Sequence, residues 1–211
     1  YVSPDGKQLY FISDRPKDGA PKEDMDVWVM DQMADGNWGE ARNLGAPVNS
    51  AASEWYPKLT ASGPLYFGSD RPGGHGKTDL YRSTWKNHTF QEPENLGSAI
   101  NSAADEYEPC IAADESFIIF MASGRPDDRG NGDLYISYRK NGQWLSAEPL
   151  DERINGRGLE ISPYLSPDNR YFFFSSARRS KDIPPGERPN QAQNGLGDIY
   201  QMHVSALPKP N

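Results

Sequence analysis

The chain has 211 residues and a net charge of −8, with its lysines and arginines scattered along the sequence. The absence of a basic cluster argues against a nucleic-acid-binding protein. No apolar run approaches the roughly 18 residues that a membrane-spanning helix needs, so we expect no membrane span.

A sequence motif, SPDGKQLYFISDR at residues 3–15, recurs three times in altered form. The later copies are TASGPLYFGSDR at 60–71, AADESFIIFMASGR at 112–125 and SPDNRYFFFSSAR at 166–178. Successive copies lie a little more than fifty residues apart, a period typical of propellers, solenoids and repeat arrays. We therefore divide the chain into four units, at approximately 1–49, 50–101, 102–155 and 156–211.

Each unit predicts the same succession of short strands. An apolar segment that contains a proline leads into a turn of SPDG type, and a second strand and a Gly-rich loop follow. A third strand then begins with DVW, DLY, DLY or DIY, and a further turn and an aromatic residue lead to NLG or, in unit three, PLD. The predicted strands are rich in aromatic and β-branched residues and are bounded by Gly, Pro, Asn and Asp, which is typical of antiparallel hairpins.

The second strand of each unit indicates how the sheets are arranged. Stretches such as FIIFM at 117–121 are continuously apolar, which predicts that both faces of the strand are buried. Radially stacked sheets bury both faces of their middle strands, whereas a sandwich leaves an outer face wet. We predict an all-β protein, a β-propeller of four-stranded antiparallel blades. Helical repeats are disfavoured by the 20 glycines and 18 prolines.

The combination of E-x-x-P, SPDGK-x-LYF-x-SDR, a Gly-rich loop, G-x-DLY and NLG-x-x-IN resembles the TolB-like, or WD-like, β-propeller repeat of bacterial envelope proteins. The resemblance covers essentially the whole chain. It implies a periplasmic or secreted protein that binds an envelope protein, peptide or glycan. Related propellers also occur as carbohydrate-active enzymes, so the family predicts the fold more narrowly than the function.

The two ends of the repeat array are incomplete. Unit one lacks most of its innermost strand, and unit four stops before its outer strand. We expect the chain to be the C-terminal part of a longer, six-bladed ring. A single propeller domain with a four-bladed ring is the alternative.

Charged residues recur at the end of each unit that carries the Gly-rich loops and the NLG connections, which we call the long-loop face. They are Arg15, Arg71 and Arg125, then Asp26, Asp79, Asp133 and Asp198, and finally Glu54, Glu106 and Glu160. We interpret them as structural corner residues, because a binding site rarely recurs in every unit. As exposed ion pairs they would contribute about 0–1 kcal/mol each. The alternative is a ring of acid and base pairs around the channel mouth.

The clearest departure from the repeat is the loop after Arg178, which is about twelve residues longer than its counterparts in units two and three. Polar loops of this kind suit recognition of a peptide or a sugar, although an insertion without a partner is an equal alternative. The ligand-binding candidates are Arg178, Arg179, Lys181, Asp182, Glu187, Arg188, Asn190 and Asn194.

No catalytic motif of the G-x-S-x-G, H-E-x-x-H or P-loop type is present. The three histidines occupy different places in the repeat, and the single cysteine, Cys110, reads as a small core residue. We therefore predict no catalytic residue, no metal site and no cofactor, with calcium in the acidic loops left open. The leading hypothesis is a non-enzymatic scaffold that engages its partner through the long-loop face. The alternative is a glycoside hydrolase or polysaccharide lyase.

Overall fold

The computed structural model describes residues 1–17, 23–178 and 197–209. Its regular elements are antiparallel β-strands, apart from one short 3-10 turn, η2 (Val204–Ala206). No helix in these three segments has the length and apolar character that a membrane crossing requires. The chain is therefore all-β, as predicted.

Four sheets follow one another in sequence order. The first contains β1 (Gln8–Ser13), β2 (Asp26–Asp31) and β3 (Arg42–Asn43). The second contains β4 (Glu54–Leu59), β5 (Leu65–Ser69), β6 (Asp79–Ser83) and β9 (Glu94–Asn95), with a separate hairpin of β7 (Trp85–Lys86) and β8 (Thr89–Phe90). The third contains β10 (Asp105–Ile111), β11 (Phe117–Ser123), β12 (Asp133–Lys140), β13 (Gln143–Trp144) and β14 (Glu148–Pro149). The fourth contains β15 (Glu160–Leu165), β16 (Tyr171–Ser176) and β17 (Asp198–His203).

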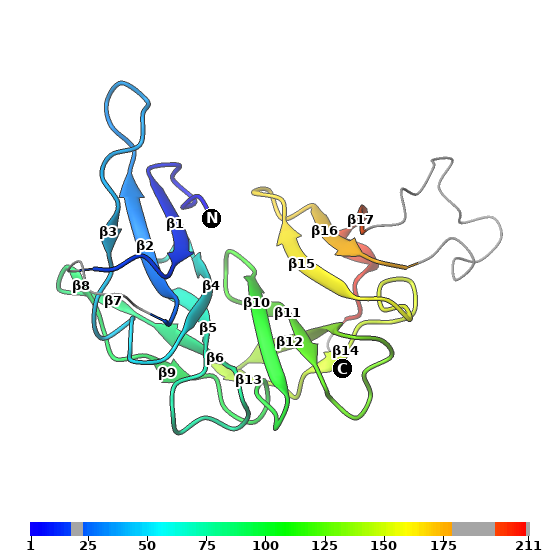
Figure 1. The fold of residues 1–211 in the computed structure, drawn as a ribbon. Coiled ribbons are helices and arrows are strands. Elements are labelled where there is room, and N and C mark those ends of the chain that lie inside the picture. The colour runs from blue at the N-terminus through cyan, green and yellow to red at the C-terminus, as the bar shows by residue number, and fades with distance from the viewer. Residues whose placement is uncertain (18–22, 179–196, 210–211) are drawn as a thin grey trace.

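The sheets form an open arc in which the strands β4, β10 and β15 lie on the inside and neighbour one another (Figure 1). We call these three the inner strands. The first sheet has only an isolated bridge, between Val2 and Leu9, where its own inner strand would lie. The incomplete first and last units expected from the sequence thus correspond to the three-stranded sheets at the ends of the arc.

Apolar clusters between the sheets hold the arc together. Alternate residues of β5 serve two clusters, because Phe67 packs with the first sheet while Tyr66 packs with the third. In β11, Phe120 faces the second sheet and Ile119 faces the fourth in the same way. Burial of these strands on both faces stabilises each sheet through its neighbours.

The predicted two-sided burial holds for β5, which is buried along its whole length, but not for β16. In β16, Phe172 and Phe174 are buried while Phe173 between them is only partly covered. The described part of the chain places a neighbouring sheet on one side of β16 only. The continuous apolar run YFFF therefore has one face without a partner sheet.

Each inner strand contains a β-bulge at the same place. The registers of β4, β10 and β15 shift there against the strand that follows, and Tyr56, Glu108 and Ser162 adopt φ angles of 49°, 55° and 56°. A proline comes directly after each of these residues, and proline has no N–H to give to the ladder. The bulge re-aims the side chains that follow it, so the E-x-x-P pattern shapes the inner surface of the arc.

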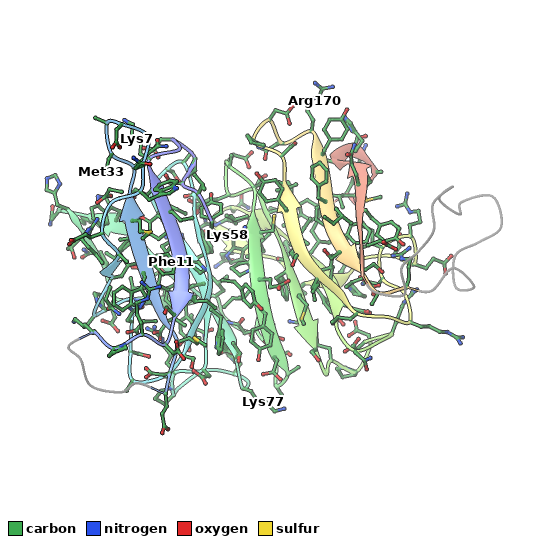
Figure 2. All side chains as sticks on the ribbon, turned by 45° about the horizontal axis from the view of Figure 1, so that its top comes forward. Lys7, Phe11, Met33, Lys58, Lys77 and Arg170 are labelled. Atoms are coloured by element: carbon green, nitrogen blue, oxygen red, sulfur yellow. The ribbon has the colours of Figure 1, made fainter. Side chains whose placement is uncertain are left out.

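The two ends of the blades differ as expected. Lys7 and Arg170, which belong to tight turns, lie at one end of the molecule, and Lys77 of a Gly-rich loop lies at the other (Figure 2). We call the first end the tight-turn face. The third strands β2, β6, β12 and β17 begin at the four repeated aspartates, at the long-loop face.

Candidate functional site

The repeated glutamates and arginines meet at the long-loop face. Nη2 of Arg71 lies 3.0 Å from Oε1 of Glu54, and Nη2 of Arg125 lies 2.9 Å from Oε1 of Glu106. Both glutamates are completely buried, and the arginine side chains are only 12% and 10% exposed. These ion pairs are therefore buried, and the prediction that they are exposed is wrong. The loss of one partner from a buried pair is correspondingly more costly.

The arginines also bind carbonyl oxygens of the preceding connection. Nη2 of Arg71 donates to the carbonyl of Val48 at 2.5 Å, and Arg178 donates to the carbonyls of Ile154 and Arg153. Arg178, a ligand-binding candidate, thus lies in the corner position of its blade. Arg15 donates to Ser13 and stacks over Phe11 and Trp28.

The repeated aspartates bind loop backbone or loop side chains. Asp79 accepts hydrogen bonds from the backbone N–H groups of His75 and Gly76, at 2.6 and 3.0 Å. Asp26 accepts from Asn43, and Asp133 accepts from the N–H of Arg129. Burial raises the pKa of Asp133 to about 6. Asp198 and Glu160 begin β17 and β15, and Glu160 accepts from Ser176 and from the N–H of Gly156.

Sequence reasoning missed a buried asparagine in three of the blades. Asn101 accepts from the backbone N–H of Leu80 at 2.8 Å and donates to its carbonyl at 3.0 Å. Asn49 and Asn155 repeat this arrangement with Val27 and Leu134. The repeated letters VNS, INS and ING were the available signal for these contacts.

The remaining ligand-binding candidates fall in a part of the chain outside the described residues. They are Arg179, Lys181, Asp182, Glu187, Arg188, Asn190 and Asn194.

The inner surface of the arc carries residues that differ from blade to blade. Two and four residues after the glutamate that opens each E-x-x-P pattern, the chain has two positions on the inner strands. The first position holds Tyr56, Glu108 and Ser162, and the second holds Lys58, Cys110 and Tyr164. The corner residues around them are the same in each of these units. We call these six residues the axial site.

The second of these positions opens onto a cavity of about 360 Å³ at the tight-turn face. Lys58, Cys110 and Tyr164 line it from three different sheets, and Tyr1 lines it from the segment before β1. Nζ of Lys58 lies 4.6 Å from the ring centroid of Tyr1 and 5.5 Å from that of Tyr164. Figure 2 shows Lys58 in the middle of the arc, between the first sheet and β10.

Burial changes the acid–base behaviour of the axial site. It lowers the pKa of Lys58 and raises the pKa of Glu108, because both charged forms lose contact with water. Lys58 and Glu108 also attract each other, which opposes both shifts. Burial raises the pKa of the Cys110 thiol to about 11. Cys110 thus fills core space as expected, and it also lines the cavity.

Glu108 lies in the middle of the inner surface. It is 8% exposed, and it accepts a hydrogen bond from the backbone N–H of Ser162 on the next inner strand. Tyr56, on the preceding inner strand, also hydrogen-bonds to it. A carboxylate held in this way links three sheets at the bulge. No group of three or more His, Cys, Asp or Glu side chains suited to a metal ion occurs among the described residues.

No protein-family model matches the chain, and no curated protein matches it in sequence. Solved structures do match in fold. A prolyl endopeptidase aligns with 97% of this chain at 15% identity and a TM-score of 0.56, and the match spans 24% of that protein. The alpha-L-arabinofuranosidase of Lactobacillus brevis aligns with 94% of the chain at 10% identity and a TM-score of 0.52, over 69% of its own length.

A protein of Agrobacterium tumefaciens assigned as TolB aligns with 70% of the chain at 19% identity, with a TM-score of 0.48 over 46% of that protein. The chain thus spans less than half of both the TolB protein and the endopeptidase. All these identities are low, so the likeness concerns the fold alone. Together with the repeated sheets, the likeness to the endopeptidase and the arabinofuranosidase supports a β-propeller type of fold for the open arc.

Proposed function

We propose that this protein is a binding scaffold of the bacterial cell envelope, built on blades of a β-propeller, that takes its ligand at the axial site. The observation that carries the proposal is the contrast within each E-x-x-P strand. The glutamate and the proline recur in every inner strand, whereas neither axial position holds the same residue type in any two of these strands. Repeat proteins place their binding residues at such departures from the shared framework.

The envelope location comes from the resemblance of the repeats to the TolB-like family. A rigid framework supports binding because its side chains are already held in place, so that little conformational entropy is lost when a ligand binds. Lys58, Glu108 and Tyr164 offer a cation, an acceptor and an aromatic face within one inner surface. A protein, a peptide or a glycan can use all three kinds of contact.

Arrays of envelope peptides and glycans test this proposal. We expect the wild-type protein to retain a subset of spots that Lys58→Met and Tyr164→Ala lose. Lys7→Met and Met33→Ala, which change exposed residues of the same tight-turn face, serve as controls and should retain those spots. A subset that survives both axial variants would place binding elsewhere and overturn the proposal.

The long loop after Arg178 remains a second candidate for partner contact. Its length and its polar residues make it a candidate, and Arg178, the residue directly before it, lies at the corner of its blade. Deletion of residues 180–194 tests it on the same arrays. Loss of bound spots with an unchanged thermal melt would assign binding to the loop, and unchanged spots would exclude it.

An enzymatic function is the alternative, and one observation favours it. Glu108 is a buried carboxyl group with a raised pKa on the inner surface, the kind of group that serves as a general acid in glycoside hydrolysis. The matched Lactobacillus brevis protein is an alpha-L-arabinofuranosidase.

If this chain has such activity, it should release 4-nitrophenol from 4-nitrophenyl arabinofuranoside. Glu108→Gln should abolish the release, and the exposed control Glu94→Gln should not. No release by the wild-type protein removes this alternative for that substrate.

A further inference from the structure

The cavity at the tight-turn face has an unusual distribution of charge. Lys58 is the only charged side chain among the described residues that line it, and no carboxylate lines it. The protein as a whole has a net charge of −8. The Lys58 ammonium and the terminal ammonium of Tyr1, which acts on it electrostatically, therefore form a local positive site on an acidic protein.

The surroundings of Lys58 leave its charge without a close counter-ion. None of the ion pairs between described residues includes Lys58, and its ammonium lies over the rings of Tyr1 and Tyr164. Glu108 interacts with it electrostatically from the deeper part of the inner strands. An ammonium held between aromatic faces and partly removed from water retains the capacity to bind an anion that enters the cavity.

The rest of the lining defines the shape and polarity of a ligand. Leu59, Ile111 and Leu165 add apolar walls, and Ser166 and Asn169 add polar groups at the tight turn. A volume of about 360 Å³ lies at the small end of the range for small-molecule sites. The cavity thus fits one ring with a short substituent better than an extended chain.

We propose that this cavity binds a compact monocarboxylate that carries one six-membered ring, with its carboxylate against the Lys58 ammonium and its ring against Tyr164 and Tyr1. The proposal rests on the axial site of the proposed function and specifies the chemistry of its ligand. A cationic ligand is disfavoured by Lys58, and a dianion would leave its second charge facing an apolar wall.

Isothermal titration with matched pairs of probes tests the proposal. Benzoate and its neutral counterpart benzamide carry an aromatic ring, and methyl glucuronide and methyl glucoside carry a sugar ring. We expect one of the two carboxylates to bind at least about tenfold more tightly than its neutral counterpart, because a hydrogen bond to a charged group strengthens binding by at least that factor. The pair that shows the difference identifies the ring as aromatic or saccharide.

Variants localise the effect. Lys58→Met should remove the preference for the carboxylate, and Tyr164→Leu should weaken both members of the pair. Tyr164 is 43% exposed, so its replacement is expected to leave the fold intact, which a thermal melt checks. Lys7→Met is the matched control, because it removes a lysine from an exposed turn of the same face.

Equal binding of the charged and neutral probes would overturn the proposal, and so would a preference that persists in Lys58→Met. Absence of binding by all four probes at millimolar concentration would also overturn it. That last result would leave the peptide and glycan arrays as the separate test of the proposed function, so the two failures are distinguishable.

Discussion

Nη2 of Arg71 lies 3.0 Å from Oε1 of Glu54, a carboxylate with no exposed surface. Glu54 also accepts hydrogen bonds from the hydroxyl groups of Ser50 and Ser69, at 2.7 and 3.1 Å. The arginine thus joins the second strand of its blade to the inner strand and, through the carbonyl of Val48, to the preceding connection. This one relationship accounts for the recurrence of the two residues in the repeat.

The pair predicts a large effect of Arg71→Met. Loss of one partner of a buried ion pair costs about 3–5 kcal/mol in the free energy of unfolding, and the hydrogen bonds that Glu54 keeps favour the lower end of that range. Urea denaturation at pH 7 measures the change. Arg42→Met is the control, because its pair with Asp31 is exposed and is worth about 0.2–1 kcal/mol.

The pH dependence of the same variant gives a second readout. Burial already raises the pKa of Glu54, and removal of Arg71 takes away a group that opposes this shift. The folded variant should therefore take up a proton at a higher pH than the wild-type protein does, and its deficit should shrink as the pH falls from 7 towards 4. A deficit of the same size at pH 4 and pH 7 would contradict a role for the charge.

Much of the fold could be predicted from local patterns. The third strands begin at the repeated aspartates, where a DLY-type motif follows a loop that contains glycine. The tight turns occur at SPDG and similar motifs. The one-sided burial of β16 could not be predicted, because its sequence is as apolar as that of β5, which is buried on both faces. What differs is whether a second sheet covers Phe173, and that depends on tertiary structure.

The axial site was missed for a related reason. Lys58 and Cys110 are far apart in sequence and look unremarkable one at a time. Only the bulge before each of them, and the packing of one inner strand against the next, bring them to one cavity. Alignment of the three E-x-x-P strands would have shown that this position varies from unit to unit. The sequence does not show, however, that the three variable side chains meet at one cavity.

Glu115 predicts a second stability effect, between the second and third sheets. It accepts hydrogen bonds from Tyr66 at 2.8 Å and Arg139 at 3.0 Å, and Arg82 lies 3.2 Å away. These contacts outweigh burial and keep the pKa of Glu115 below its usual value. Glu115→Gln should lower the free energy of unfolding by about 1–3 kcal/mol at pH 7.

The sign of the pH dependence follows from that lowered pKa. The stability that Glu115 contributes is present above the pKa of the unfolded chain and is lost as the pH falls through the pKa of the folded protein. Unfolding measured from pH 7 down to pH 3 should bring Glu115→Gln and the wild-type protein together. Glu152→Gln, at an exposed position, is the control and should match the wild-type protein throughout.

Asp133 predicts the opposite sign. Its pKa of about 6 in the folded protein exceeds the usual 3.8, chiefly because burial disfavours the charged form. The folded protein therefore holds a proton that the unfolded chain has released, and stability falls as the pH rises from about 4 to about 6. Relative to the wild-type protein, Asp133→Asn should become progressively more stable across this window.

A control with a lowered pKa separates this effect from the rest of the titration. Gln8 and Arg42 hold the pKa of Asp31 below its usual value, so Asp31→Asn should become less stable relative to the wild-type protein as the pH rises. Denaturation series of the three proteins, compared at each pH, provide the measurement. A parallel course for both variants would contradict the assignment of the two shifts.

The last prediction concerns the carboxylate that competes for Lys58. Glu108 attracts the Lys58 ammonium and would repel the carboxylate of a bound ligand. Glu108→Gln keeps an oxygen for the N–H of Ser162 and removes the charge, so it should tighten binding of the preferred ring carboxylate by about three- to tenfold at pH 7, as expected for an interaction of order 1 kcal/mol.

The pH profile of that affinity has two limbs. In the wild-type protein it should rise as the pH falls through the raised pKa of Glu108, for as long as the ligand stays ionised, and it should decline at alkaline pH sooner than for an ordinary lysine. Among the other titratable groups at the cavity, the Cys110 thiol and the Tyr1 phenol have pKa values of about 11 and 12 and stay neutral over this range, whereas burial and Lys58 lower the pKa of the Tyr1 terminal ammonium, which titrates within it. Glu108→Gln should lose the acidic limb and keep the alkaline one, because the two cations, Lys58 and the terminal ammonium of Tyr1, still lose their charge as the pH rises. Titration calorimetry from pH 5 to pH 10 measures both limbs, and an acidic limb that persists in Glu108→Gln would show that a different group controls the affinity.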